Sequence, residues 1–194
     1  LLKLKSRGMN VPELAIGDGA MGFWAALEEV YPETRQQRCW MHKTMNVLNY
    51  LPTLNQPKAK QVLHSIWQAE TQVDAEKAFD LFIKTYELKY PKAAFRLHKD
   101  REELMAFYDF PAPHWQSTRT NNPIESTFGT IRHRTKRSKG CLLRDGMLHM
   151  MFKLGLCVEK KWRRFHSLDY LSKVVTGIKF KDGVEVTEVD QVSA

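Results

Sequence analysis

The stretch that decides how the chain is read is NNPIESTF, residues 121–128. It has the composition of a helix start, because Asn122 suits the N-cap and Pro123 suits the first helical position, where no backbone donor is needed. Glu125 then stands three residues after the cap, as in a capping box. A strongly basic run, residues 132–139, follows directly. Glu125 is therefore either a structural cap or a metal ligand beside a cationic face.

The positive charge of the chain is concentrated in that part of the sequence. The 194 residues include 30 Lys and Arg against 22 Asp and Glu, a net charge of +8. Residues 125–166 contain 11 of the basic residues and three acids, so this segment carries the whole excess. Such a distribution is typical of a surface that faces a polyanion, and the alternative is an ordinary solvated helix face.

The composition also limits the class of protein. With 43% hydrophobic residues the chain can build a core, and it has no apolar run long enough for a transmembrane helix and no signal peptide. Three widely spaced cysteines, Cys39, Cys141 and Cys157, predict no disulfide framework and fit a reducing cytosol. The first residues resemble the tail of a helix, so we expect an N-terminally incomplete piece of a longer protein.

The first forty residues predict a strand, a helix and a second strand. Residues 12–16 form a short apolar run that ends at Asp18 between two glycines, which predicts a buried strand with Asp18 at its carboxyl end. Ligands bind at such ends in open α/β sheets, although a plain turn aspartate is the alternative. A helix is expected over 21–31 and a strand over 35–42. Cys39 and His42 have metal-ligand spacing, but a zinc site would need a second pair.

The rest of the chain has helical periodicity. We expect four regions: a strand–helix–strand segment at 1–42, a helical block at 43–113 inserted before the Glu125 helix, that helix with basic helices after it at 114–166, and a tail at 167–194. The Glu125 helix is predicted to run to about residue 136. Residues 144–164 are predicted to form one long helix whose buried stripe is Met147, Met151, Leu154 and Val158. The tail is either a small strand or loose.

Two carboxylates on such elements have a recognisable chemistry. Asp18 and Glu125 offer oxygen ligands of the kind that Mg²⁺ and Mn²⁺ prefer. Two such metals can activate an attacking oxygen and stabilise a leaving oxygen at a phosphodiester. The basic segment would then hold the phosphate backbone. The spacing alone is weak evidence, since acids this far apart occur in any protein.

Several motifs together resemble the Mutator-type transposases of bacterial insertion sequences. The resemblance runs in order from about residue 14 to about residue 182. The motifs are Gly17-Asp18-Gly19-Ala20, Arg38-Cys39-Trp40-Met41-His42-Lys43, Phe107-Tyr108-Asp109-Phe110-Pro111, Asn122-Pro123-Ile124-Glu125-Ser126-Thr127, Arg132-His133-Arg134-Thr135, Lys139-Gly140-Cys141 and Lys161-Trp162-Arg163-Arg164.

The resemblance implies a fold and a set of catalytic residues. The fold would be α/β, mostly helical: a ribonuclease-H-like core of the Asp-Asp-Glu type, here incomplete, with an all-helical insertion. Asp18 resembles the second catalytic Asp and Glu125 the catalytic Glu, both as ligands of a two-metal Mg²⁺ (or Mn²⁺) site. Cys39 and His42 resemble the family's Cys-x-x-His signature, to which we assign a role in shaping the site or handling DNA.

The implied partner is double-stranded DNA, as element ends and as target. A homo-oligomer is among the states considered, no membrane is involved, and the location would be the bacterial cytoplasm, with nucleoid association. The residues expected to bind DNA are Arg119, Asn122, Arg132, His133, Arg134, Lys136, Arg137 and Lys139.

One departure from the family pattern concerns the first catalytic Asp. The family carries it on an early strand that would precede Leu1. We therefore expect that this chain by itself cannot cleave DNA. Two functions stay open: part of an enzyme that cuts and joins DNA, or a non-catalytic DNA-binding remnant of a truncated transposase.

Overall fold

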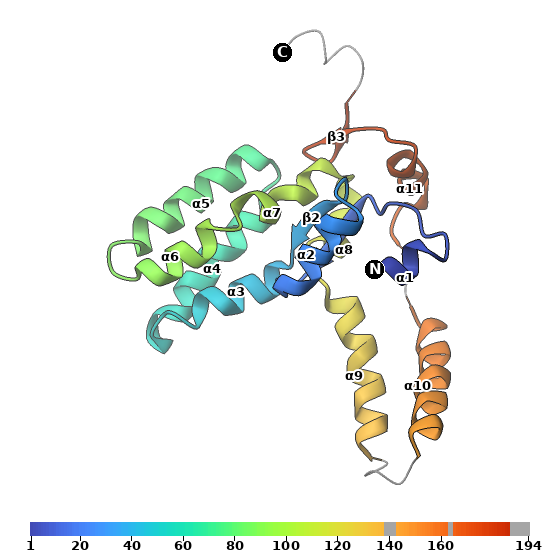
Figure 1. Ribbon diagram of the computed structural model, residues 1–194. Helices are drawn as coiled ribbons and strands as arrows, with labels where there is room; N and C mark the ends of the chain where they lie inside the picture. The colour runs from blue at the N-terminus through green and yellow to red at the C-terminus, as the bar shows by residue number, and fades with distance from the viewer. Residues whose placement is uncertain (138–142, 163–164, 187–194) are drawn as a thin grey trace. The chain divides into compact units, whose positions relative to one another are not determined.

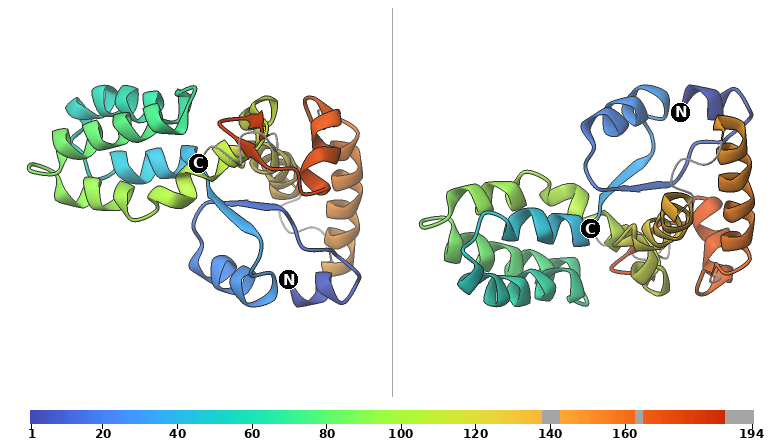
Figure 2. Two further views of the ribbon diagram at one scale, coloured as in Figure 1. Left: turned by 90° about the horizontal axis from the view of Figure 1, so that it is seen from above. Right: turned by 90° about the horizontal axis from the view of Figure 1, so that it is seen from below.

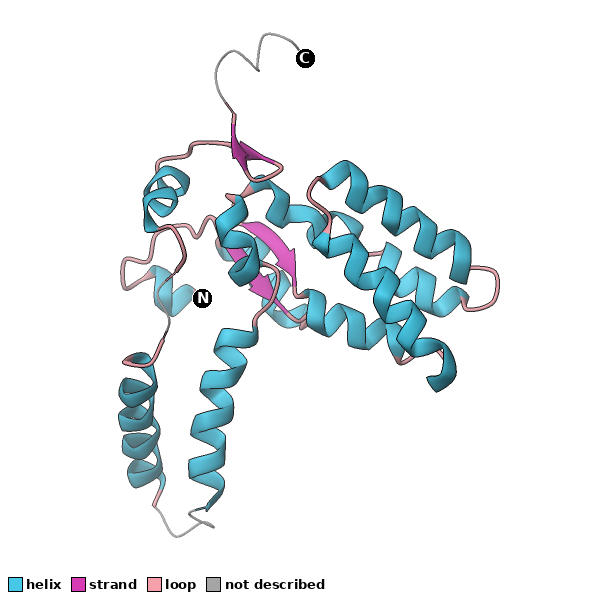
Figure 3. Ribbon diagram, turned by 180° about the vertical axis from the view of Figure 1, so that it is seen from behind, coloured by secondary structure: helices cyan, strands magenta, loops and turns pink. Residues whose placement is uncertain are grey.

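The computed structural model describes residues 1–137, 143–162 and 165–186. Its backbone contacts divide the chain into two compact units. The first comprises Leu1–Thr120 together with Ser167–Ala194, and the second comprises Asn121–His166. Within the described residues the protein is mostly helical, with a few short strands (Figures 1 and 3).

The first unit begins with the predicted strand, helix and strand. After the short helix α1 (Leu2–Lys5) come β1 (Leu14–Gly17), α2 (Met21–Val30) and β2 (Arg35–Arg38). The two strands pair in parallel, with Leu14 opposite Arg35 and Gly17 opposite Arg38. Their carboxyl ends therefore lie at the same edge. Asp18 follows the carboxyl end of β1 as predicted, but the prediction of a buried strand is wrong, because all four residues of β1 are half-buried.

The helix α2 covers this strand pair with part of its predicted apolar face. Leu27 and Val30 are buried, together with Tyr31, and the Trp24 ring packs so closely on Gly17 that a β-carbon there would lie 2.7 Å from it. Phe23 stays 40% exposed, so the apolar stripe read from the sequence is only partly buried.

The second strand is shorter than predicted. The sequence predicted a strand over 35–42, but β2 ends at Arg38 and α3 (Trp40–Leu48) begins two residues later. The backbone amide of Cys39 still donates to the Gly17 carbonyl at 2.8 Å, and that of Trp40 donates to the Arg119 carbonyl at 3.0 Å. These bonds satisfy donors at the start of α3, where a helix leaves its first amides without partners of its own.

The region predicted to be a helical block consists of short helices and contains the main core. Its helices are α3, α4 (Gln56–Gln68), α5 (Gln72–Tyr86), α6 (Pro91–His98) and α7 (Arg101–Met105), with 3₁₀ turns η1 (Thr53–Asn55) and η2 (Ala106–Asp109). They pack together to one side of the strand pair, as both views of Figure 2 show. The block buries large apolar side chains such as Leu63, Ile66, Phe79, Phe82, Leu97 and Phe107.

A buried glutamine joins the second strand to this block. The side chain of Gln37 is fully buried, and its Oε1 accepts from the Phe107 amide at 2.8 Å while its Nε2 donates to the Leu104 carbonyl at 3.3 Å. The indole of Trp40 donates to the same carbonyl at 2.8 Å. These bonds fix β2 against α7 and η2, since a buried polar group without a partner is costly.

The end of the chain returns to the first unit. It adds α11 (Leu168–Val175) and a hairpin of β3 (Phe180–Lys181) and β4 (Val184–Glu185), next to the earlier η3 (Ala112–His114) and α8 (Trp115–Thr118). At the hairpin tip, Gly183 donates to the Tyr108 carbonyl at 3.2 Å and accepts from the Ala112 amide at 3.1 Å. Of the two forms considered for the tail, a small strand or a loose segment, its described residues form a docked hairpin.

The second unit contains two paired helices, α9 (Asn122–Arg137) and α10 (Arg144–Glu159). Figure 1 shows them side by side. The indole of Trp162 donates to Thr127 Oγ1 at 3.0 Å and so connects the residues after α10 to α9. The helix predicted over 144–164 is wrong at its end, because α10 stops at Glu159. The predicted buried stripe is also wrong: Met147, Leu154 and Val158 are half-buried and Met151 is exposed.

Candidate metal carboxylates and nucleic-acid interface

Asp18 stands one residue beyond β1, at the carboxyl edge of the strand pair. Its side chain is exposed, and its Oδ1 accepts from the Ala20 amide at 3.1 Å, which fixes the turn that follows the strand. The next residue, Gly19, has φ of +100°. Only glycine adopts such a conformation without strain, so this turn depends on it. The carboxylate is thus presented to solvent from a defined turn.

A buried ionic cluster lies directly behind this turn. The Arg38 guanidinium occupies the space next to Gly19, where a β-carbon would lie 1.6 Å from its Nη1. Arg38 Nε donates to Asp100 Oδ2 at 3.0 Å, and the same oxygen accepts from the buried Lys43 ammonium. Lys43 Nζ also donates to the Arg96 carbonyl at 2.9 Å. Burial lowers the pKa of Lys43, and the Asp100 carboxylate opposes that shift.

Sequence reasoning did not find the role of Arg38 or Asp100. Arg38 lies opposite Gly17 in the parallel strand pair. A correct prediction of that register would have placed Arg38 next to the Asp18 turn. Asp100 stands just before α7 in the helical block, and no local pattern links it to Arg38, 62 residues earlier.

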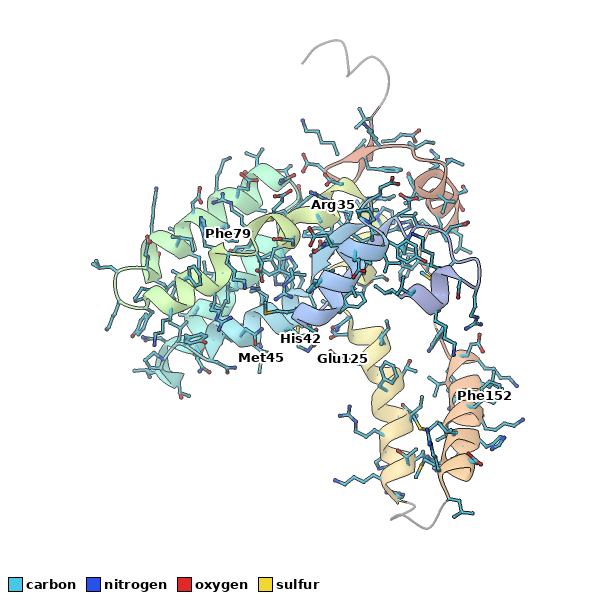
Figure 4. All side chains as sticks on the ribbon, in the orientation of Figure 1. Arg35, His42, Met45, Phe79, Glu125 and Phe152 are labelled. Carbon is cyan, nitrogen blue, oxygen red and sulfur yellow. The ribbon has the colours of Figure 1, made fainter. Side chains whose placement is uncertain are left out.

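The signature pair Cys39 and His42 lies at the same strand edge. Cys39 is buried and is the residue before α3, and His42 is half-buried in the first turn of that helix, labelled in Figure 4. They are therefore one helical turn apart. Among the described residues, no three His, Cys, Asp or Glu side chains come together as a metal site would require.

Glu125 lies at the beginning of α9 (Figure 4). The helix starts one residue earlier than predicted: the carbonyl of Asn121 accepts from the Glu125 amide at 3.2 Å, so Asn121 is the N-cap and Asn122 is already helical. Glu125 is then the fourth helical residue. A capping box needs its carboxylate at the third, so the box predicted with Asn122 as its cap is wrong by one position.

The exposed side of α9 brings Glu125 together with basic residues. An α-helix has 3.6 residues per turn, so residues separated by four or seven positions lie on the same side. This side of α9 carries Glu125, Arg132 and Lys136, with His133 beside them. All four are exposed, whereas Thr127, Ile131 and Thr135 on the opposite side are half-buried. Asn122, three residues before Glu125, is exposed on the same side of the helix, whereas Arg134 and Arg137 are exposed at other angles. The predicted Lys139 lies outside the described residues.

Arg119, also predicted to bind DNA, is engaged inside the first unit. Its Nε donates to the Trp115 carbonyl at 3.1 Å, its Nη1 donates to the Trp67 carbonyl, and its guanidinium lies 5.1 Å from the Trp67 ring and 5.4 Å from that of Phe107. Burial lowers the pKa of Arg119. These contacts give it a packing role, which its position in the sequence did not indicate.

The donor chemistry of the two predicted ligands suits a hard cation. Asp18 belongs to the first unit and Glu125 to the second. Both are exposed carboxylates, the ligand type that Mg²⁺ takes, usually with waters completing its shell. The residues present therefore fit a divalent metal in kind.

The chain belongs to the Mutator family of transposases, since the family model described as "Transposase, Mutator family" matches residues 1–142. Among its relatives, the transposase for insertion sequence element IST2 of Acidithiobacillus ferrooxidans is 54% identical over 185 residues, 95% of this chain. The transposase for insertion sequence element IS6120 of Mycolicibacterium smegmatis is 44% identical over 179 residues, 92% of this chain.

The chain is shorter than these relatives. It spans 62% of the length of the IST2 transposase and 55% of the IS6120 transposase. The family predicted from the sequence motifs is confirmed. No helix among the described residues has the length and apolar character needed to cross a membrane.

Proposed function

We propose that this chain is the part of an insertion-sequence transposase that binds DNA and supplies two of the carboxylates for metal-dependent strand cleavage and strand transfer. The observation that carries the proposal is the exposed side of α9, where Glu125 stands in line with Arg132 and Lys136. The family membership and the high identity to named transposases support it.

The proposed fold of the catalytic part is a ribonuclease-H-like core. The parallel pair β1 and β2, with Asp18 at its carboxyl edge, would be part of its sheet. The block from α3 to η2, inserted between that pair and the Glu125 helix, would be the all-helical insertion. In this arrangement a residue from the insertion, Asp100, holds the arginine that backs the Asp18 turn.

The proposed metal is Mg²⁺ or Mn²⁺, held by Asp18 and Glu125. Such an ion supplies activation of an attacking oxygen and charge stabilisation at a phosphodiester. The chain's own contributions are carboxylates on defined elements. The Gly19 turn and the half-buried Arg38 fix the backbone that carries Asp18, and the first turn of α9 carries Glu125. We assign Cys39 and His42 to shaping the strand edge beside Asp18.

The proposed partner is double-stranded DNA, bound through its backbone. Cations on one side of a helix contact phosphates without reading base sequence, and their binding releases counterions. Arg132, His133 and Lys136 would make the main contacts, and Arg134 and Arg137 would add to the local positive charge.

The test is a chimera in which this chain replaces its aligned 62% of the IST2 transposase. The chimera should cut and join DNA carrying the element ends, and Glu125→Gln should abolish both steps while leaving DNA binding intact. Glu159→Gln, which removes an exposed carboxylate from the end of α10, is the matched control and should stay active. Strand transfer retained by Glu125→Gln would refute the assignment.

The second candidate, a DNA-binding remnant without catalysis, is favoured by one observation: Asp18 and the basic side of α9 belong to different units of the chain. In that case the chimera would bind DNA in a salt-dependent way but would not cut it, with or without Glu125.

A further inference from the structure

Gly129 occupies a central position on the exposed side of α9. It follows Glu125 by four residues and precedes Arg132 by three, so the three share one side of the helix. The opposite side faces the partner helix, because Thr127, Ile131 and Thr135 are half-buried there and the Trp162 indole bonds Thr127 Oγ1. Gly129 therefore lies between a carboxylate and a guanidinium on the solvent side.

Nothing among the described residues requires a glycine at this position. A β-carbon added at Gly129 would meet no described atom within 4 Å, and its backbone is not in the left-handed region that favours glycine. Glycine in a helix interior is also less favourable than alanine. Gly129 therefore makes α9 less stable than an alanine would, without improving its packing. This favours a role for Gly129 in contact with another molecule.

The charge of the neighbouring side chains indicates the kind of molecule that would bind here. The exposed residues on the turns after Gly129 are Arg132, His133 and Lys136. Such a cationic side attracts a polyanion. Two other glycines within helices also have open space, Gly22 on α2 and Gly155 on α10, but neither lies between a candidate metal ligand and a row of cations.

We propose that Gly129 is a contact site for the DNA backbone, where the missing side chain lets one sugar–phosphate strand of a duplex lie directly against α9 between Glu125 and Arg132. Arg132 and Lys136 contact phosphates further along the same strand. The close approach brings a phosphodiester near Glu125, so the inference rests on the proposed function and deepens it. Any side chain at this position would hold the strand away from the helix.

The test measures stability and DNA binding together, with labelled duplex DNA as the probe. Gly129→Ala should raise the melting temperature, because alanine is the better helix former, and yet weaken DNA binding about tenfold, which corresponds to loss of one or two good contacts. Gly129→Leu should weaken it further. Gly155→Ala is the matched control: it should also raise the melting temperature but leave binding unchanged.

A higher melting temperature together with weaker DNA binding in Gly129→Ala, but not in Gly155→Ala, would support the inference. A glycine with only a structural role would not produce this combination. Wild-type affinity in Gly129→Ala, or an equal loss in Gly155→Ala, would overturn it. If the wild-type chain shows salt-dependent binding while Gly129→Ala matches it, the inference fails and the proposed function stands. Absence of salt-dependent binding in the wild type would overturn both.

Discussion

The half-buried Arg38 and the buried Asp100 form an ion pair, Nε to Oδ2 at 3.0 Å, that joins the end of β2 to the helical block. The same carboxylate is bonded by the buried Lys43, while the Arg38 guanidinium lies against Gly19. The turn that presents Asp18 is therefore supported by a residue from a different part of the sequence. Loss of Asp100 should affect both the fold and that turn.

Asp100→Asn should lower the free energy of unfolding by about 3–5 kcal/mol at pH 7, because it leaves buried cations without their counter-charge. Urea unfolding measures this. The double variant Lys43→Met/Asp100→Asn should recover part of the loss, because one stranded charge is removed. Equal stability of Asp100→Asn and wild type would contradict the role of the pair.

The same cluster predicts a pH dependence. Burial lowers the pKa of Lys43 in the folded protein below its ordinary value of 10.5. Between the folded-state pKa and 10.5, the unfolded chain therefore binds more protons than the folded one. Stability should therefore rise with pH through that window. In Asp100→Asn the opposing carboxylate is gone, the pKa falls further, and the rise should begin at lower pH. A stability deficit of the variant that grows from pH 7 to pH 9 would contradict this sign.

Gly19→Ala should destabilise the protein by about 1–3 kcal/mol, since its φ of +100° strains any other residue and the new methyl group would displace Arg38. Gly22→Ala is the matched control, three residues later on α2 with open space around it. It should stabilise the protein by up to about 1 kcal/mol. Thermal unfolding that shifts in the same direction for both variants would refute the distinction.

Thr71→Ala should cost about 1 kcal/mol, because Thr71 caps α5 by accepting from the Asp74 amide at 3.2 Å. Hydrogen bonds from Lys77 and Thr71 lower the pKa of Asp74. These bonds therefore contribute to the stability of the fold above pH 3.8, and that contribution is lost as the pH falls through the lowered pKa. The variant should therefore lose less stability in acid than the wild type. Thr85→Ala, inside α5, is the control and should be nearly neutral.

Arg119→Lys separates a packing role from DNA binding. The ammonium keeps the charge but loses the planar contacts with Trp67 and Phe107, so the protein should lose about 1–2 kcal/mol of stability. Arg119→Gln, which also removes the charge, should leave the salt dependence of DNA binding unchanged. A reduced salt dependence with unchanged stability would restore the role predicted for Arg119 from the sequence.

Local patterns predicted the regular elements well. The apolar run before Asp18, the helical periodicity of the block and the position of α9 were all readable because each depends on neighbouring residues. The start of α9 was missed by one residue because two adjacent asparagines suit a cap equally. The end of β2 was missed because it depends on the Arg119 carbonyl, far along the chain.

The supporting contacts of the candidate site were not predictable in the same way. Asp100 looks like any exposed acid between helices, and only the folded chain places it against Arg38 and Lys43. Arg119 was assigned to DNA because it precedes the Glu125 motif, whereas its partners Trp67 and Phe107 lie in distant helices. The sequence identifies residue types suited to the chemistry, and long-range packing decides which of them face solvent.

The most direct test of the central claim is the salt dependence of duplex DNA binding by this chain. If Arg132 and Lys136 contact phosphates, Arg132→Gln/Lys136→Gln should reduce the slope of log affinity against log salt by about 2. Lys58→Gln/Lys84→Gln, two exposed lysines of the helical block, should leave the slope unchanged. A wild-type slope in the α9 variant would contradict the claim that this side of the helix binds the DNA backbone.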